Sequence, residues 1–347
     1  MNIAGRKIGS ENPPFIIGEM SGNHNQSLDR AIEIVEAAAK AGVDAIKLQT
    51  YTADTMTLDL SEGEFFISDP ENLWEGTSLY KLYEQAYTPW EWHDPIFKRI
   101  RELGMVAFSS PFDESAVDFL ESLDTPCYKI ASFENIHIPL IRKVAATGKP
   151  VIISTGMATL EELQEAVDVA RQAGCNDIIL LKCTSTYPAK LENSNLLTIP
   201  HMRDHFKCEV GLSDHTMGVT AALGSIAYGA SVIEKHITLR RSDGGVDSAF
   251  SMEPEEMALL VREAKQIKRA MGEIHYGPTE AESESVMYRR SLYICNDLNA
   301  GDEITSENVR AIRPGRGLPP KFMDKVLGMK VKIDVKCGTP LSWDIIE

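Results

Sequence analysis

The sequence predicts a (β/α)₈ barrel followed by a small β-rich module. Eight short apolar runs alternate with amphipathic segments, polar residues recur where each run ends, and the pattern changes from about residue 290 onward. With 347 residues, the chain can supply a barrel of roughly 250 residues and one further module. We therefore expect a barrel over 1–274, a linker over 275–289 and the β-rich module over 290–347.

The predicted strands are short and rich in β-branched residues. They are FIIGEM (15–20), AIKLQTY (45–51), MVAFSSPF (105–112), CYKIASF (127–133), VIISTGM (151–157), IILLKCTS (178–185), CEVGLSD (208–214) and SVIEKHIT (231–238). Near-continuous apolar strands are typical of a buried parallel sheet. A doubly wound open sheet is the alternative, but no GxGxxG motif opens the first helix, so eight units favour a closed barrel.

The segments between the strands have helical periodicity and defined ends. LDRAIEIVEAAAKAG is apolar at i, i+3, i+4 and i+7 and ends at Gly42, while TLEELQEAVDVARQAG begins with Thr159 as its N-cap. The helix over 253–272 would close the barrel. The polar stretch that follows has neither helical nor strand periodicity and is interpreted as the linker. The short strands beyond it predict a module with a thin core, which favours support from a partner surface.

Composition excludes several classes of protein. The formal net charge of −16, without a Lys/Arg cluster, argues against nucleic-acid binding. No apolar run reaches the ~18 residues that span a bilayer, and MNIAGRKIGSENPPF has no apolar core followed by a cleavage site. We expect a cytoplasmic protein that binds neither nucleic acid nor membrane. The six cysteines lie far apart without a CxxC pair and are interpreted as structural.

Polar residues at the strand ends carry the functional signal, because barrel enzymes place their chemistry there. Burying Lys47 or Lys129 without a counter-charge costs several kcal/mol, so each should face an anion, and a ligand is favoured over a carboxylate side chain. Lysines beside small hydroxyls predict an anion site, although each hydroxyl could instead cap a helix. The residues at these ends include Glu19, Lys47, Gln49, Ser110, Lys129, Ser132, Glu134, Ser154, Ser185, Tyr187 and Ser213.

Two histidines, His215 and His236, end the last two strands. Imidazoles at the same level of adjacent strands can bind one divalent ion and leave positions for water and a substrate oxygen. Hydrogen-bonded core histidines are the alternative, but the nearby acids Asp247 and Glu19 favour a metal. We expect a divalent cation, Mn²⁺ or Mg²⁺.

Eight motifs occur in order along the barrel: GEMSGNHN, KLQT, SSPF, KIASFE, ISTGM, CTSTYP, GLSDHT and EKHIT. In this order they resemble the sialic-acid synthase family. The C-terminal AIRPGRGLPP and GMKVKIDVKCGTPL resemble the antifreeze-like (SAF) domain of that family. The insertion NLWEGTSLYKLYEQAYTPWEWHDPIF, together with SGNHNQSLDRA, resembles the pseudaminic acid branch more than the neuraminic or legionaminic branches.

The resemblance implies a metal-dependent condensation of phosphoenolpyruvate with the amino-sugar aldehyde 2,4-diacetamido-2,4,6-trideoxy-L-altrose, giving pseudaminic acid and phosphate. It implies metal ligands at His215 and His236, with Glu19 and Asp247 beside the reacting carbons and one of them as general base. Gln49 and Tyr187 would line the sugar side. Ser185 stands where neuraminic acid synthases usually carry Asn, which leaves the phosphate contact there open. The implied phosphoenolpyruvate contacts are Lys47, Ser110, Lys129, Ser132, Ser154 and Ser213.

The resemblance also implies a domain-swapped homodimer in which an arginine of the module enters the partner's barrel. Arg313 matches that arginine, and Arg316 is the second choice. A synthase of the same family acting on N-acetylmannosamine or on the legionaminic precursor is the nearest alternative. A metal-dependent hydrolase would normally carry HxH on its first strand, where this chain has only Glu19. A non-catalytic carbohydrate-binding protein would not need converging lysines, histidines and acids.

Overall fold

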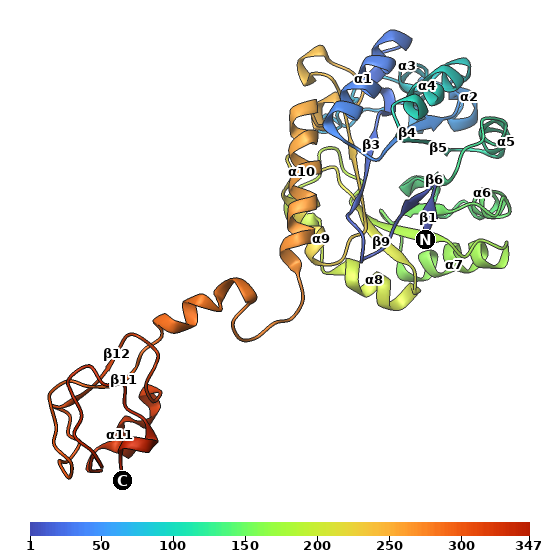
Figure 1. Ribbon diagram of the computed structural model, residues 1–347. Helices are drawn as coiled ribbons and strands as arrows, with labels where there is room; N and C mark the ends of the chain where they lie inside the picture. The colour runs from blue at the N-terminus through green and yellow to red at the C-terminus, as the bar shows by residue number, and fades with distance from the viewer. The chain divides into compact units, whose positions relative to one another are not determined.

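The structure is a computed structural model that describes residues 1–347. The chain divides into two compact units, Met1–Gly272 and Glu273–Glu347 (Figure 1). This division lies close to residue 274, where the sequence pattern placed the end of the barrel. No helix in the chain is long and apolar enough to cross a lipid bilayer.

The first unit is a closed barrel with the strand order β10-β3-β4-β5-β6-β7-β8-β9. Every pair is parallel, and β10 closes the ring by pairing with both β9 and β3. The eight predicted strands are therefore confirmed, and the open-sheet alternative is excluded. The strands are β3 Phe15–Glu19, β4 Ala45–Thr50, β5 Val106–Pro111, β6 Tyr128–Ile130, β7 Val151–Ser154, β8 Ile178–Cys183, β9 Glu209–Ser213 and β10 Val232–His236.

Helices surround these strands (Figure 1). Ser27 caps the first long helix, which ends at Gly42 with φ 87°, a left-handed conformation that glycine adopts without steric cost. Thr159 and Glu162 form the capping box expected before α7. The helices of this unit are α1 Leu28–Ala41, α2 Ala53–Met56, α3 Leu79–Ala86, α4 Trp90–Glu102, α5 Glu114–Ser122, α6 Ile138–Ala145, α7 Leu160–Gln172, α8 Thr198–Phe206, α9 Thr220–Ala227 and α10 Pro254–Met271.

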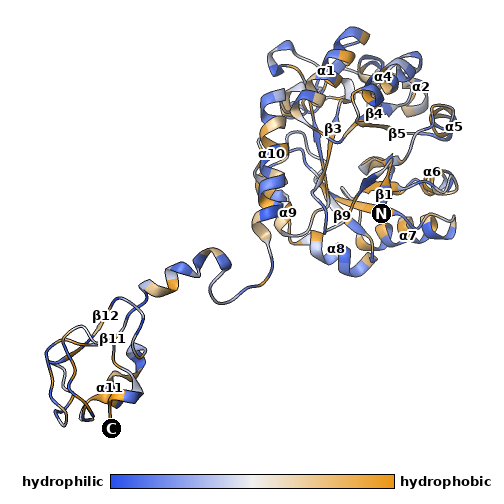
Figure 2. Ribbon diagram, viewed as in Figure 1, coloured by the Kyte–Doolittle hydropathy of each residue, from blue (hydrophilic) through white to orange (hydrophobic).

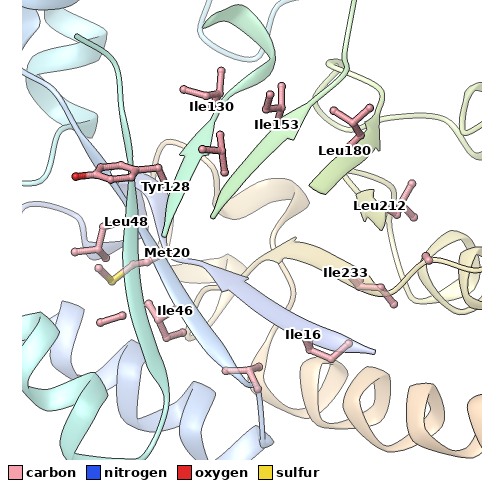
Figure 3. Packing of buried hydrophobic residues seen from close by; sticks show 14 of the residues in the cluster. Ile16, Met20, Ile46, Leu48, Tyr128, Ile130, Ile153, Leu180, Leu212 and Ile233 are labelled. Carbon is pink, nitrogen blue, oxygen red and sulfur yellow. The ribbon is translucent and has the colours of Figure 1, made fainter. Parts of the chain in front are cut away.

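Successive side chains along each strand point alternately into two separate apolar cores. Ile16, Ile46, Ile153 and Leu180 belong to the large cluster between the strands and the helices (Figure 3). Their neighbours one residue along each strand belong to a second cluster, which fills the inside of the barrel. In Figure 2 the strands are mostly apolar, whereas the helices carry both polar and apolar residues.

A short antiparallel hairpin that the sequence analysis did not predict precedes the barrel. It consists of β1 Asn2–Ile3 and β2 Arg6–Lys7. Ile3 and Ile8 are buried in the same cluster as Phe15 and the other residues inside the barrel. The hairpin therefore completes the core at the amino ends of the strands and leaves the carboxyl ends for the site.

The second unit has its own small core. Strands β11 Ser291–Ile294 and β12 Val309–Ile312 pair antiparallel, and α11 Met323–Val326 follows. Leu292, Ile304, Val331 and Leu341 are fully buried in its apolar cluster. The segment interpreted as the linker contains two 3₁₀ turns, η7 Glu280–Glu282 and η8 Glu284–Tyr288. Most other strands predicted in the module are isolated bridges rather than ladders.

Candidate active site

The inner face of the barrel changes from apolar to polar toward the carboxyl ends of its strands. On β4, Ala45 lies in the inner core, and Lys47 and Gln49 continue the same face. On β10, Val232 lies in the inner core, and Glu234 and His236 continue that face. The same alternation places the strand-borne candidates on one mouth: Glu19, Lys47, Gln49, Ser110, Lys129, Ser154 and Ser213.

Lys47 and Lys129 are each paired with buried carboxylates, which is the alternative that the sequence did not favour. Lys47 Nζ lies 2.7 Å from Glu19 Oε2 and 3.7 Å from Glu234 Oε1. Lys129 Nζ donates to Glu234 Oε1 at 3.3 Å, and Ser213 Oγ donates to the same oxygen at 3.2 Å. Glu234 is not among the site residues predicted from the sequence. Its position two residues before His236 was the available signal, because residues two apart on a strand share a face.

Burial of this cluster changes its titration. Burial raises the pKa of Glu19 to about 7, against the opposing effect of the Lys47 ammonium. Burial also lowers the pKa of Lys129, although the Glu234 carboxylate favours the charged ammonium. Two ammonium groups facing two carboxylates leave little net charge. An incoming anion is therefore bound more favourably when Glu19 takes up a proton.

Small hydroxyls gather around Gly156, after β7. The Gly156 amide donates to Ser132 Oγ at 3.2 Å, and a Cβ at Gly156 would lie 2.7 Å from that oxygen and closer still to Ser185 Oγ. Ser154 Oγ is buried without a hydrogen-bond partner. A residue other than glycine would fill this space, so the backbone and hydroxyls form a cradle suited to anion oxygens.

The helix-capping alternative fails for these hydroxyls. The helices that follow are capped by Asp113 before α5 and Thr159 before α7, while α6, α8 and α9 have no side-chain cap. None of the candidate serines occupies an N-cap. These serines are Ser110, Ser132, Ser154, Ser185 and Ser213.

The two strand-end histidines are neighbours, with ring centroids 5.3 Å apart. His215 Nδ1 lies 3.0 Å from the Thr184 carbonyl oxygen, so Nδ1 carries the proton and the Nε2 lone pair remains available. His236 Nδ1 is buried without a partner, 3.9 Å from Asp247 Oδ2. Burial and the nearby positive groups hold the pKa of His236 well below its usual value, so the ring is neutral.

These donors fit a divalent cation in part. Imidazoles are suitable ligands, and the unpartnered His236 is not explained as a hydrogen-bonded core residue. The Asp247 carboxylate is close by and accepts a hydrogen bond from Ser21. No group of three or more His, Cys, Asp or Glu side chains surrounds one point, so water and substrate would have to complete the coordination.

Aromatic rings border the histidines. Tyr187 lies 4.6 Å from His215 between ring centroids, and Phe250 lies 4.9 Å from His236 and 5.2 Å from Tyr187. Tyr187 is among the residues predicted from the sequence, whereas Phe250 is not, because Phe250 belongs to the 3₁₀ turn Ser248–Phe250 and not to a strand. These rings give the histidine side of the mouth an apolar wall.

Two further candidates flank the charged cluster. Gln49 Nε2 donates to Glu19 Oε1 at 2.9 Å, which fixes one oxygen of that carboxylate. Glu134 Oε2 is buried without a partner, and burial raises the pKa of Glu134 to about 7. A carboxyl group with a free oxygen and this pKa can exchange a proton near neutral pH.

Arg313 and Arg316 lie in the second unit. Both residues are exposed, and neither side chain makes a hydrogen bond or an ion pair within the chain. The prediction that Arg313 enters a partner's barrel therefore stays a prediction. Both guanidinium groups remain available to a ligand or a second chain.

The fold and the site together define a (β/α)₈-barrel enzyme with anion-binding groups and a pair of histidines at one mouth. The chain belongs to the NeuB family, whose model matches residues 34–276, and the SAF domain model matches residues 289–347. These matches confirm the resemblance drawn from the eight motifs and from the C-terminal module.

Named relatives cover nearly the whole chain. It is 44% identical to the pseudaminic acid synthase of Helicobacter pylori, over 96% of this chain and 98% of that protein. It is 35% identical to the N,N'-diacetyllegionaminic acid synthase of Legionella pneumophila, over 98% and 96% of the two chains. Among solved structures, the N-acetylneuraminic acid synthetase of Leptospira borgpetersenii in complex with citrate matches with a TM-score of 0.74 at 30% identity, covering 82% of this chain and 94% of that one.

Proposed function

We propose that this chain is a pseudaminic acid synthase. The enzyme would be a transferase that joins phosphoenolpyruvate to 2,4-diacetamido-2,4,6-trideoxy-L-altrose and releases phosphate. The observation that carries the proposal is the meeting of two buried lysines, a hydroxyl cradle and a pair of available imidazoles at one barrel mouth. The greater identity to a pseudaminic than to a legionaminic acid synthase favours this sugar.

Phosphoenolpyruvate would occupy the charged half of the mouth. Lys129 and the hydroxyls of Ser132 and Ser154 suit the phosphate, because charge-assisted and hydroxyl hydrogen bonds together satisfy its oxygens. Lys47, which donates to Ser110 Oγ at 3.2 Å, suits the carboxylate. Glu234 would keep both ammonium groups aligned before the anion binds.

We infer that His215 and His236 hold a divalent cation, Mn²⁺ or Mg²⁺, at the sugar side. When bound, the cation acts as a Lewis acid on the aldehyde oxygen of the open-chain sugar. The unpartnered His236 ring and the proton fixed on His215 Nδ1 support these two ligands.

The chain's own groups would then orient the reactants and move one proton. C3 of phosphoenolpyruvate forms a bond with the aldehyde carbon, C2 takes up a water molecule, and the C2–O bond breaks to release phosphate. The lysines stay bound to the anionic groups throughout. A carboxylate must accept the proton of the water. Glu19 and Asp247 are the first candidates, and Glu134 joins them because its Oε2 has no competing partner.

A homodimer in the cytoplasm would complete the enzyme. Large apolar side chains are exposed on the loops that follow β6, β7, β8 and β9, and exposed apolar groups gathered on one rim favour cover by another surface. We propose that the module of the second subunit covers this rim and contributes its Arg313. The rim residues are Phe133, Ile136, Met157, Leu191, Leu197 and Met217.

One experiment separates the candidate functions. The purified protein is incubated with phosphoenolpyruvate, Mn²⁺ and, in parallel, the diacetamido-trideoxy sugar, N-acetylmannosamine and the legionaminic precursor. We expect phosphate release and a nine-carbon product with the first sugar. Product from another sugar alone would assign the chain to another branch. No phosphate release with any sugar would overturn synthase activity.

A further inference from the structure

Trp74, in the insertion between β4 and β5, is fixed at the histidine side of the mouth. Its indole Nε1 donates to the carbonyl oxygen of Val246 at 2.8 Å, and Val246 directly precedes Asp247. The ring is half-buried, although residues on either side of it are exposed. This hydrogen bond gives the surface loop that carries Trp74 a defined position over the loop after β10.

The indole extends the aromatic wall beside the two histidines. The ring centroids of Trp74 and Tyr187 are 5.8 Å apart, and Tyr187 in turn contacts His215 and Phe250. The faces of the Trp74 and Phe250 rings offer a hydroxyl group no hydrogen-bond partner, and the indole N–H is already bonded to the Val246 carbonyl oxygen. A methyl group or an acetamido methyl would be bound there more favourably than a hydroxyl, which would lose its hydrogen bonds to water.

A cavity of about 500 Å³ adjoins the same indole. Its lining combines the apolar Leu73, Trp74 and Leu82 with polar residues, which are Asn25, Gln26, Glu75, Thr77 and Gln85. This volume lies within the range of small-molecule sites. Apolar side chains beside polar ones match the chemistry of an acetamido group, which has a methyl, a carbonyl and an N–H.

We propose that Trp74 determines sugar specificity: its indole selects a hexose with acetamido groups at C2 and C4 and a deoxy C6 over a hexosamine with hydroxyls at C4 and C6. This inference rests on the proposed function, because the sugar aldehyde must lie at the histidines for the rest of the sugar to reach Trp74. The selection would arise from hydroxyl groups left unpaired against the indole.

The test compares kcat/KM for the diacetamido-trideoxy sugar and for N-acetylmannosamine. In Trp74→Ala the ratio should fall by about 10- to 100-fold, while the KM for phosphoenolpyruvate stays as in the wild type. Phe66→Ala, which removes an exposed aromatic from the same connection between β4 and β5, is the matched control and should leave both quantities unchanged. An unchanged ratio, or an equal loss on both sugars with a raised phosphoenolpyruvate KM, would overturn the inference.

A second measurement does not depend on the alanine variant folding. Addition of the sugar should change tryptophan fluorescence in the wild type, and Trp74→Phe, which keeps an aromatic ring, should lose that change while retaining most of the sugar preference. An emission change that persists in Trp74→Phe contradicts the contact. If the wild type makes product from the diacetamido sugar, any such failure concerns Trp74 alone. If it makes none, the proposed function fails first, and this inference fails with it.

Discussion

The two halves of the mouth are built differently. The anion half consists of side chains on the strands, such as Lys47, Lys129 and Glu234, which the barrel ladder fixes to one face. The sugar half depends on loop residues, such as Trp74 and Phe250, held by one hydrogen bond or by ring contacts. The groups that bind the anion therefore lie on the rigid part of the barrel, whereas the groups proposed to select the sugar lie on loops, which tolerate sequence change.

The histidine pair joins the two halves, and its loss should have the largest effect. His215→Ala or His236→Ala should lower kcat by at least about 10³-fold, because a Lewis acid contributes several kcal/mol to the transition state. The thermal midpoint should change little, since the rings lie at the mouth and not in the core. Titration of each variant with Mn²⁺, followed by calorimetry or electron paramagnetic resonance, should show that it has lost the Mn²⁺ site. Near-normal rates in either variant would remove the metal assignment.

Removal of one lysine tests the anion half. Lys129→Met should raise the phosphoenolpyruvate KM by about 10- to 100-fold, because it deletes a charge-assisted contact. Lys47→Met should act in the same direction. Steady-state kinetics with the sugar at saturation gives the measurement. If both variants bind phosphoenolpyruvate as the wild type does, the anion site lies elsewhere.

Glu234, which pairs with both Lys47 and Lys129, has a separate test. Glu234→Gln should lower the free energy of unfolding by about 3 kcal/mol, because it leaves two buried ammonium groups without their shared partner. Urea unfolding followed by circular dichroism measures this. Lys235→Met is the informative comparison: Lys235 pairs with Asp214 on the opposite face of β10, so it should lower stability without changing the phosphoenolpyruvate KM. A changed KM in Lys235→Met would contradict the division into two faces.

The C-terminal module, which carries Arg313, is the third region to be compared with the two halves of the mouth. Cutting the chain near residue 280 should leave a folded barrel with little activity. At a phosphoenolpyruvate concentration well below the KM of Lys129→Met, both Arg313→Ala and Lys129→Met should be nearly inactive. Mixing them after reversible dissociation should restore up to half of the sites in each heterodimer, because one site then carries both lesions and the other carries none. If mixing restores no activity, Arg313 does not act across the subunits.

The pH dependence of kcat should be a smaller effect than the changes above. It should show which carboxylate acts as the general base. A general base must be ionised, so kcat should fall below about pH 7 and level off above it if Glu134, with a pKa of about 7, accepts the proton. Glu134→Gln should remove this limb, whereas Asp247→Asn should keep it. A limb that survives in Glu134→Gln would point to Glu19, whose pKa is also about 7.

The same raised pKa values affect stability. The folded protein binds more protons than the unfolded chain between the ordinary glutamate pKa of 4.5 and about 7. The contribution of Glu19 and Glu134 to stability is therefore present at low pH and is lost as the pH rises through that window.

The sequence by itself determined the fold and most of the anion half. Its eight apolar runs fixed the strands, and the period of two along each strand fixed which side chains share the inner face, since both depend only on local backbone geometry. The family followed from motifs in a fixed order. The pairing of both lysines with Glu234, the approach of Ser132 and Ser185 to Gly156, and the contact of Trp74 with Val246 were decided only by the tertiary structure. Each joins residues far apart in the chain, and no local periodicity records which distant groups the closed barrel brings within hydrogen-bond distance.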